Sequence, residues 1–198
     1  MNKSHHFENQ DQINLWRRLV EHSFDQEGYC QLSFRDRLCR ENNWNADYAD
    51  GAILEYKKFI FLVIFSGHGA TPSDEVDQVW HLHLQYSYNY WVQFCGEILG
   101  QQVHHGPTKG GKNESEKYQN YYQKTLESYL KYFGQRPLHI YWPDSKTRFE
   151  MAPYFRRINT KETLIINFGP ILKIVDAIPY SALLGIILLG ISYLTLTS

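Results

Sequence analysis

The side chains best suited to chemistry are concentrated in one part of the chain, residues 68–107. Four of the five histidines in this part, together with Asp77, fall in or just after a segment with the pattern of a helix. Imidazole and carboxylate groups bind divalent metals and transfer protons. This part of the chain is therefore predicted to hold a functional site. Its candidate residues are Asp77, His81, His83, His104 and His105.

Helical geometry decides which of these groups can meet. At about 100° per residue, Asp77 and His81 lie about 40° apart, one turn from each other. His83 points about 160° away from His81, so one ion does not easily take both histidines, and one of the two is expected to be structural. Cys95 is in register with Asp77 but lies about 27 Å along the axis of a straight helix. Cys95 is therefore excluded from a shared site unless the helix breaks.

Three interpretations of the central segment stay open. In the first, His81 binds a divalent metal such as zinc together with His104 or His105, brought back by the following loop. Asp77 is then either a further ligand or the carboxylate that holds the imidazole. Trp80 and His83 would then be supporting residues. In the second, the Asp77–His81 pair acts as a general base without metal. In the third, the same groups only satisfy one another's hydrogen bonds within the core.

The surrounding pattern predicts a mainly α, single helical domain of about five helices in residues 1–145. An apolar run at 59–65 is too short to span a membrane and is the expected centre of the core. Ser33 and Ser73 are predicted N-caps. Residues 138–142 are expected to form a short strand or an extended strap. The expected helices cover residues 11–24, 34–44, 46–65, 74–99 and 114–133.

The C-terminal part has a different composition. Residues 177–198 carry no charge, and about 20 such residues span a bilayer as a helix. Residues 146–176 are then a juxtamembrane linker. Four basic residues precede the apolar stretch and nothing charged follows it: Arg156, Arg157, Lys161 and Lys173. This asymmetry predicts a single-pass C-terminal membrane anchor with the N-terminal domain in the cytoplasm. A buried C-terminal core helix is the alternative.

Composition narrows the functional classes. The net charge is −1 and no helix is strongly basic, so no nucleic-acid partner is expected. Three cysteines without a CxxC spacing indicate a reducing compartment. The sequence contains no P-loop, dinucleotide fingerprint, nucleophile elbow or HExxH motif, which argues against the familiar enzyme classes.

The central block also resembles a known family. The spaced residues Pro72-Ser73-x-x-Val76-Asp77-x-x-Trp80-His81-x-His83-Leu84, followed by Tyr90, Cys95, Gly100, His105 and Pro107, are similar to the signature of the glycine-rich domain-containing protein-like family. The similarity covers roughly residues 10–145. The chain lacks the long glycine-rich region of plant members and is closer to short bacterial forms with a hydrophobic tail. The resemblance implies a helical domain with a shared site, but no settled reaction.

Two functions follow as predictions. The first is a membrane-anchored cytoplasmic binding or scaffold module with an Asp/His metal site, whose partners are the lipid bilayer and another protein. The alternative is a metal-dependent or acid–base enzyme centred on His81.

Overall fold

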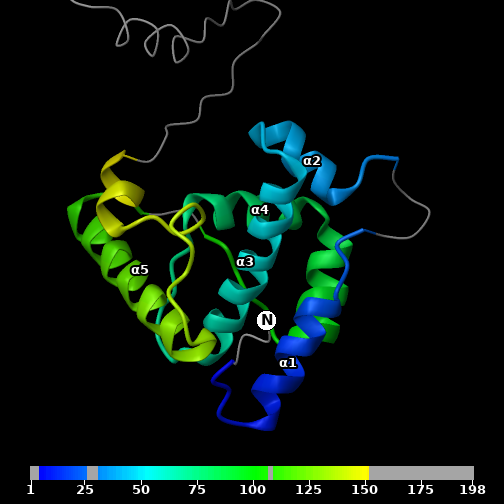
Figure 1. The fold of residues 1–198 in the computed structure, drawn as a ribbon, viewed down its shortest axis with the longest axis horizontal. Coiled ribbons are helices and arrows are strands. Elements are labelled where there is room, and N and C mark those ends of the chain that lie inside the picture. Colours follow the sequence, from blue (N-terminus) through cyan, green and yellow to red (C-terminus); the bar gives the residue numbers. More distant parts are fainter. Residues whose placement is uncertain (1–4, 26–30, 107–108, 152–198) are drawn as a thin grey trace, which may run out of the picture. The chain divides into compact units, whose positions relative to one another are not determined.

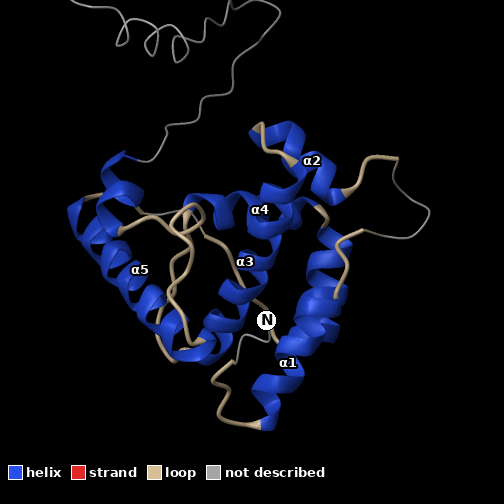
Figure 2. Ribbon diagram, viewed as in Figure 1, coloured by secondary structure: helices blue, strands red, loops and turns tan. Residues whose placement is uncertain are grey.

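The computed structural model describes residues 5–25, 31–106 and 109–151, which belong to one compact unit. These residues form helices and loops and contain no strand (Figures 1 and 2), so the predicted mainly α class is confirmed. Seven helices are seen there instead of about five. They are α1 (Gln10–Glu21), α2 (Phe34–Asn42), α3 (Ala46–Phe65), α4 (Asp74–Gln85), the π-helix η1 (Asn89–Leu99), α5 (Lys112–Phe133) and the short π-helix η2 (Thr147–Met151).

Helix α3 is the centre of the domain. It contacts α1, α2, α4 and α5, and Figure 1 shows it between α5 on one side and α1 on the other. Its apolar end lies in the core, as predicted. Burying a large apolar side chain stabilises a fold by about 1.5–3 kcal/mol, so this one segment contributes strongly to stability. The residues of this end that are fully buried are Phe59, Ile60, Phe61 and Leu62.

A buried polar cluster fixes α3 against α5. Glu55 Oε1 accepts hydrogen bonds from Lys58 Nζ at 2.7 Å and from the Tyr129 hydroxyl at 3.1 Å. Its other oxygen accepts a bond from Trp142 Nε1 at 2.9 Å. A buried carboxylate is tolerated only when its charge and its lone pairs are satisfied, and here both oxygens are used. The cluster therefore joins α3, α5 and the segment around Trp142.

The predicted helix starts are confirmed at Ser33 and Ser73. The Ser33 hydroxyl accepts a hydrogen bond from Asp36 N, and the Ser73 hydroxyl accepts one from Val76 N. Each bond satisfies one of the N–H groups that the first turn of a helix leaves without a partner. Ser73 is fully buried, so the start of α4 is held firmly in place.

The prediction of one continuous helix over residues 74–99 is wrong. Helix α4 ends at Gln85, and Tyr86 leaves the helical conformation with φ −83° and ψ 59°. On a straight helix Asn89 would lie about 120° around the axis from His83. In the structure the break lets the Asn89 side chain turn inward, where its Oδ1 accepts bonds from His83 Nε2 at 2.8 Å and His22 Nε2 at 3.0 Å. These two hydrogen bonds stabilise the broken conformation.

The expected strand or strap at residues 138–142 is also wrong. The segment forms turns, in which the backbone N–H groups of Tyr141 and Trp142 both donate to Leu138 O. Residues 147–151, placed in the linker by the sequence, form η2, and Arg148 there contacts Pro72 O.

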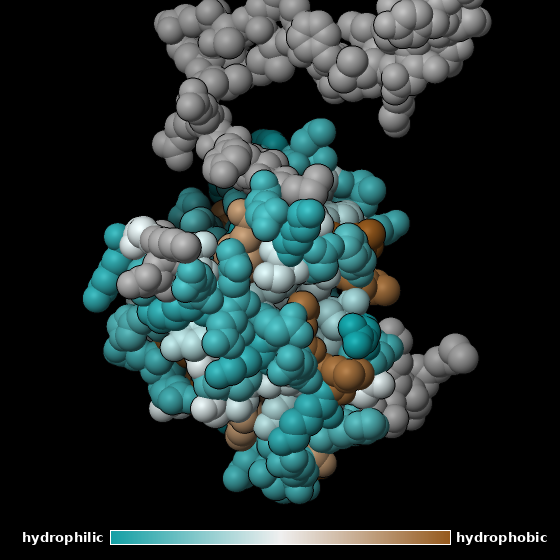
Figure 3. Space-filling view, turned by 90° about the vertical axis from the view of Figure 1, so that its left-hand side faces the viewer, coloured by the Kyte–Doolittle hydropathy of each residue, from teal (hydrophilic) through white to brown (hydrophobic). Residues whose placement is uncertain are grey.

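The face shown in Figure 3, which is the side of the molecule that carries α5, is mostly hydrophilic.

The predicted membrane helix at 177–198 lies outside the described residues. Among the helices that are described, none combines the length and the apolar character needed to cross a bilayer.

Candidate metal centre

Helix α4 presents Asp77 and His81 on the same face, one turn apart, as the sequence predicts. His81 Nε2 lies 3.7 Å from Asp77 Oδ2. The Asp77 side chain is 20% exposed, whereas the His81 side chain is 50% exposed. Asp77 therefore lies at the inner side of the pair and His81 at the solvent side.

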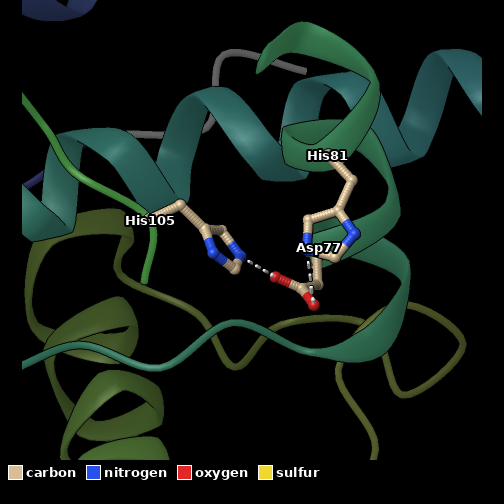
Figure 4. Close-up of side chains that lie close together, drawn as sticks. All are labelled: Asp77, His81 and His105. Atoms are coloured by element: carbon tan, nitrogen blue, oxygen red, sulfur yellow. Dashed lines mark hydrogen bonds and ion pairs between the residues drawn. The ribbon is translucent and has the colours of Figure 1, made fainter. Parts of the chain in front are cut away.

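The loop after η1 adds His105 to this pair. His105 Nε2 lies 2.7 Å from Asp77 Oδ1, and the His81 and His105 rings are 4.7 Å apart between centroids. Figure 4 shows the carboxylate between the two imidazoles. One ligand atom from each of the three residues lies within 4.8 Å of the other two. Two imidazoles and one carboxylate thus converge from two segments of the chain.

A buried tyrosine connects this loop to α4. Trp80 Nε1 donates to the Tyr90 hydroxyl at 2.9 Å, and the same hydroxyl donates to Val103 O. The Trp80 ring also contacts the His105 ring edge to face, with 4.4 Å between centroids. Trp80, Tyr90 and Val103 are all buried. This chain of contacts fixes where the loop passes α4 and so places His105.

His104 lies elsewhere, although the sequence grouped it with His105 as a metal ligand. Its Nε2 lies 3.1 Å from Gln102 Oε1, and its ring packs beside Trp91. Because neighbouring residues in an extended loop point in different directions, only one of the two histidines reaches Asp77. His104 instead lines the pocket beside the site.

His83 points to the opposite side of α4 and is completely buried. The Asn89 amide nitrogen donates to Ser23 O, so its Oδ1 is the acceptor and His83 Nε2 is the donor. His83 Nδ1 then accepts from the Tyr56 hydroxyl at 2.9 Å. Burial lowers the pKa of His83 to about 3, and the ring is neutral near pH 7. Both nitrogens are occupied, so His83 serves the core and does not join the site.

Cys95 is also separate from the site. Its thiol is buried next to Tyr90 and the backbone of Val103, and burial raises its pKa. The break after α4 does not bring it to Asp77. Its chemistry is that of a core cysteine.

A pocket of about 560 Å³ opens beside the three-residue group. Asp77 and His105 form part of its wall, and Arg148 and Phe149 from η2 form another part. Arg148 could not be assigned to the site from sequence because it lies 71 positions from Asp77 in a stretch that reads as a linker. The pocket has the size of a site for a small organic molecule.

The donor set fits a divalent transition metal. Zinc binds imidazole nitrogens and carboxylate oxygens at about 2.0–2.2 Å, so in a tetrahedral site two ligand atoms lie about 3.4 Å apart. The three ligand atoms lie within 4.8 Å of one another, so they must draw closer to hold one ion, and His81 is the most exposed of the three side chains. The hydrogen bond between Asp77 and His105 would also have to give way to bonds with the metal. In the absence of a metal, the same bond makes a carboxylate–imidazole pair that can transfer protons.

Comparison of the chain with models of protein families, with curated proteins and with solved structures gives no match.

Proposed function

We propose that Asp77, His81 and His105 bind one divalent metal ion, such as zinc, and that the domain is a metal-dependent enzyme. The observation that carries the proposal is the convergence of the three ligand atoms within 4.8 Å at the edge of a pocket. The group joins residues 28 positions apart, and the loop that completes it is held at Val103 by a buried hydrogen bond from the Tyr90 hydroxyl.

The number of ligands favours a catalytic ion over a structural one. Structural zinc sites are closed by four protein ligands, whereas catalytic sites use three and leave a position for water or substrate. Asp77, His81 and His105 are the three candidates among the described residues, and the pocket lies next to two of them. A metal held there would polarise a carbonyl or phosphoryl oxygen or activate a water molecule.

Metal analysis of the full-length protein, purified without a polyhistidine tag, tests the proposal. We expect one ion per chain, lost in His81→Ala and in His105→Ala. His104→Ala is the matched control because His104 neighbours His105 and lines the same pocket but is not in the three-residue group. An ion that stays bound in both His81→Ala and His105→Ala would contradict the assignment.

A second candidate is a metal-free general base. It is favoured by the 2.7 Å contact between Asp77 and His105, in which the carboxylate orients the imidazole. The two candidates separate in a zinc titration of the metal-free protein. Absence of saturable zinc binding would exclude the metal centre and leave the acid–base pair.

We also propose, from sequence alone, that residues 177–198 anchor the domain to a membrane with residues 1–145 in the cytoplasm. The uncharged length of this segment and the basic residues before it support the proposal. Deleting residues 177–198 is expected to move the protein from the membrane fraction to the soluble fraction. The family resemblance and a scaffold role toward a protein partner likewise stay predictions. If the protein binds no metal but binds another protein specifically, the scaffold function is favoured over the enzyme.

A further inference from the structure

We infer that the pocket beside the metal centre binds a small organic anion, whose carboxylate or phosphate group contacts both the metal ion and Arg148. The inference deepens the proposed function and rests on it, because one of the two contacts is the proposed metal. It names a class of ligand that the metal centre alone does not indicate.

The first argument is the state of the Arg148 guanidinium. Its Nε donates to Pro72 O at 3.4 Å and its Cζ lies over the Phe149 ring, 5.4 Å from the centroid. Its two terminal amino groups have no hydrogen bond or ion pair with another described residue. A guanidinium group offers five N–H donors in a planar fork that matches carboxylate and phosphate oxygens. Arg148 therefore lines the pocket with most of its donors available.

The second argument is the balance of charge. Asp74 and Glu75 on α4 lie near enough to sense Arg148, but neither forms an ion pair with it among the described contacts. Neither carboxyl group is among the residues that line the pocket, whereas Arg148 is. Among the residues that line the pocket, Asp77 is the one carboxylate and Arg148 the one permanent cation, so a divalent ion at the metal centre would make the lining net positive. The pocket then favours a negative ligand.

The third argument is the composition of the other walls. Pro72, Trp80, Tyr118 and Phe149 give the pocket apolar and aromatic surface. A bare inorganic ion would leave that surface in water, whereas a ligand with an apolar body would cover it. A volume of about 560 Å³ accommodates such a body. A carboxylic acid or a phosphate ester with a small apolar part fits these features together.

The experiment uses the full-length protein loaded with cobalt(II), which takes the same kinds of ligand as zinc and whose visible spectrum responds to changes at the ion. Acetate, benzoate, inorganic phosphate and phenyl phosphate are titrated in a non-coordinating buffer. We expect at least one carboxylate or phosphate to change the spectrum saturably, and the phenyl-bearing ligand to bind more tightly than its small counterpart. Binding of acetate and benzoate would indicate a carboxylate ligand, whereas binding of inorganic phosphate and phenyl phosphate would indicate a phosphate ligand.

Variants at Arg148 test the second contact. Arg148→Gln is expected to weaken anion binding by about 10- to 100-fold without loss of cobalt, because a charge-assisted hydrogen bond is removed. Arg148→Lys keeps the charge without the planar fork, so its anion affinity should lie between those of the unmodified protein and Arg148→Gln. Thermal unfolding checks that each variant is folded. Arg136→Gln, which replaces an exposed arginine that does not line this pocket, is the control and should bind like the unmodified protein.

The outcomes separate the two proposals. Cobalt that binds stoichiometrically while none of the four anions changes its spectrum would overturn the inference and leave the metal centre intact. Equal anion affinities in Arg148→Gln and Arg136→Gln would overturn the inference in the same way. Cobalt that does not bind at all would overturn the metal centre itself, and the ligand that bridges metal and arginine would fall with it.

Discussion

His105 Nε2 lies 2.7 Å from the Asp77 carboxylate although 28 positions separate the two residues. The contact depends on a loop that returns along α4 and is fixed at Val103 through the Tyr90 hydroxyl. Trp80 takes part twice, because its indole N–H donates to Tyr90 and its ring packs against His105. The geometry of the site therefore depends on buried side chains that are not ligands themselves.

Replacing Tyr90 by phenylalanine tests this dependence. The change leaves Trp80 Nε1 and Val103 O without their shared partner inside the core, which should lower the free energy of unfolding by about 1–3 kcal/mol. Metal affinity should fall about 10- to 100-fold, as for other losses of groups that orient ligands. Urea unfolding and zinc titration measure the two effects. Tyr88→Phe is the control because Tyr88 is 59% exposed, and a Tyr90→Phe protein with unchanged zinc affinity would refute the positioning role.

His81 and His83 are two positions apart and should give opposite results. His83→Ala leaves a cavity and removes a partner of both Tyr56 and Asn89, so the free energy of unfolding should fall by about 2–4 kcal/mol. The folded fraction should still bind metal. His81→Ala should change stability by less than about 0.5 kcal/mol, because the side chain is half exposed, but should abolish metal binding. Equal losses of stability in the two variants would contradict the division of roles.

The Glu55 cluster predicts a stability effect remote from the site. Glu55→Gln leaves the buried Lys58 ammonium without its carboxylate, and breaking a buried ion pair in this way costs about 3–5 kcal/mol. Denaturant unfolding of the metal-free protein should show the loss. Glu41→Gln removes an exposed ion pair with Arg40 and should cost less than about 1 kcal/mol. If Glu55→Gln lowers the free energy of unfolding by no more than Glu41→Gln does, the buried cluster does not contribute the predicted stability.

Alkaline pH should unfold the protein cooperatively. Burial raises the pKa of Tyr56, Tyr90, Tyr122 and Tyr129 above the ordinary value. Their contribution to stability is complete below about pH 10 and is lost as the pH rises above it, because the unfolded chain ionises first. Each such phenol adds a slope of up to about 1.4 kcal/mol per pH unit.

Lys57 acts in the opposite direction at slightly lower pH. Burial lowers the pKa of Lys57 to about 8. Between that pH and about 10.5 the folded protein has released a proton that the unfolded chain still holds, so the free energy of unfolding rises with pH. Unfolding free energies and phenolate absorbance between about pH 9 and 11 check both effects. Tyr129→Phe should reduce the alkaline slope, whereas the exposed Tyr88→Phe should not. Complete ionisation of the tyrosines in a protein that keeps its native circular dichroism would contradict the prediction.

The sequence was sufficient for features that depend on neighbours along the chain. The bounds of α3, the caps at Ser33 and Ser73 and the placing of Asp77 and His81 on one face follow from the helical period and from local hydrogen bonds. The apolar run at the end of α3 identified the core because only a buried helix is apolar on all sides.

The tertiary structure decided what depends on contacts between distant residues. Periodicity continues across Tyr86 to Tyr88, so nothing local marks the break that lets Asn89 turn toward His83. The choice of His105 over His104 depends on how the Tyr90 hydroxyl fixes the loop, and Arg148 reaches the pocket only through packing of η2. The sequence alone thus determined the helices and one pair of candidate ligands, because a helix is set by its own residues. The third ligand and the pocket come from the packing of α4, the returning loop and η2, which no local pattern specifies.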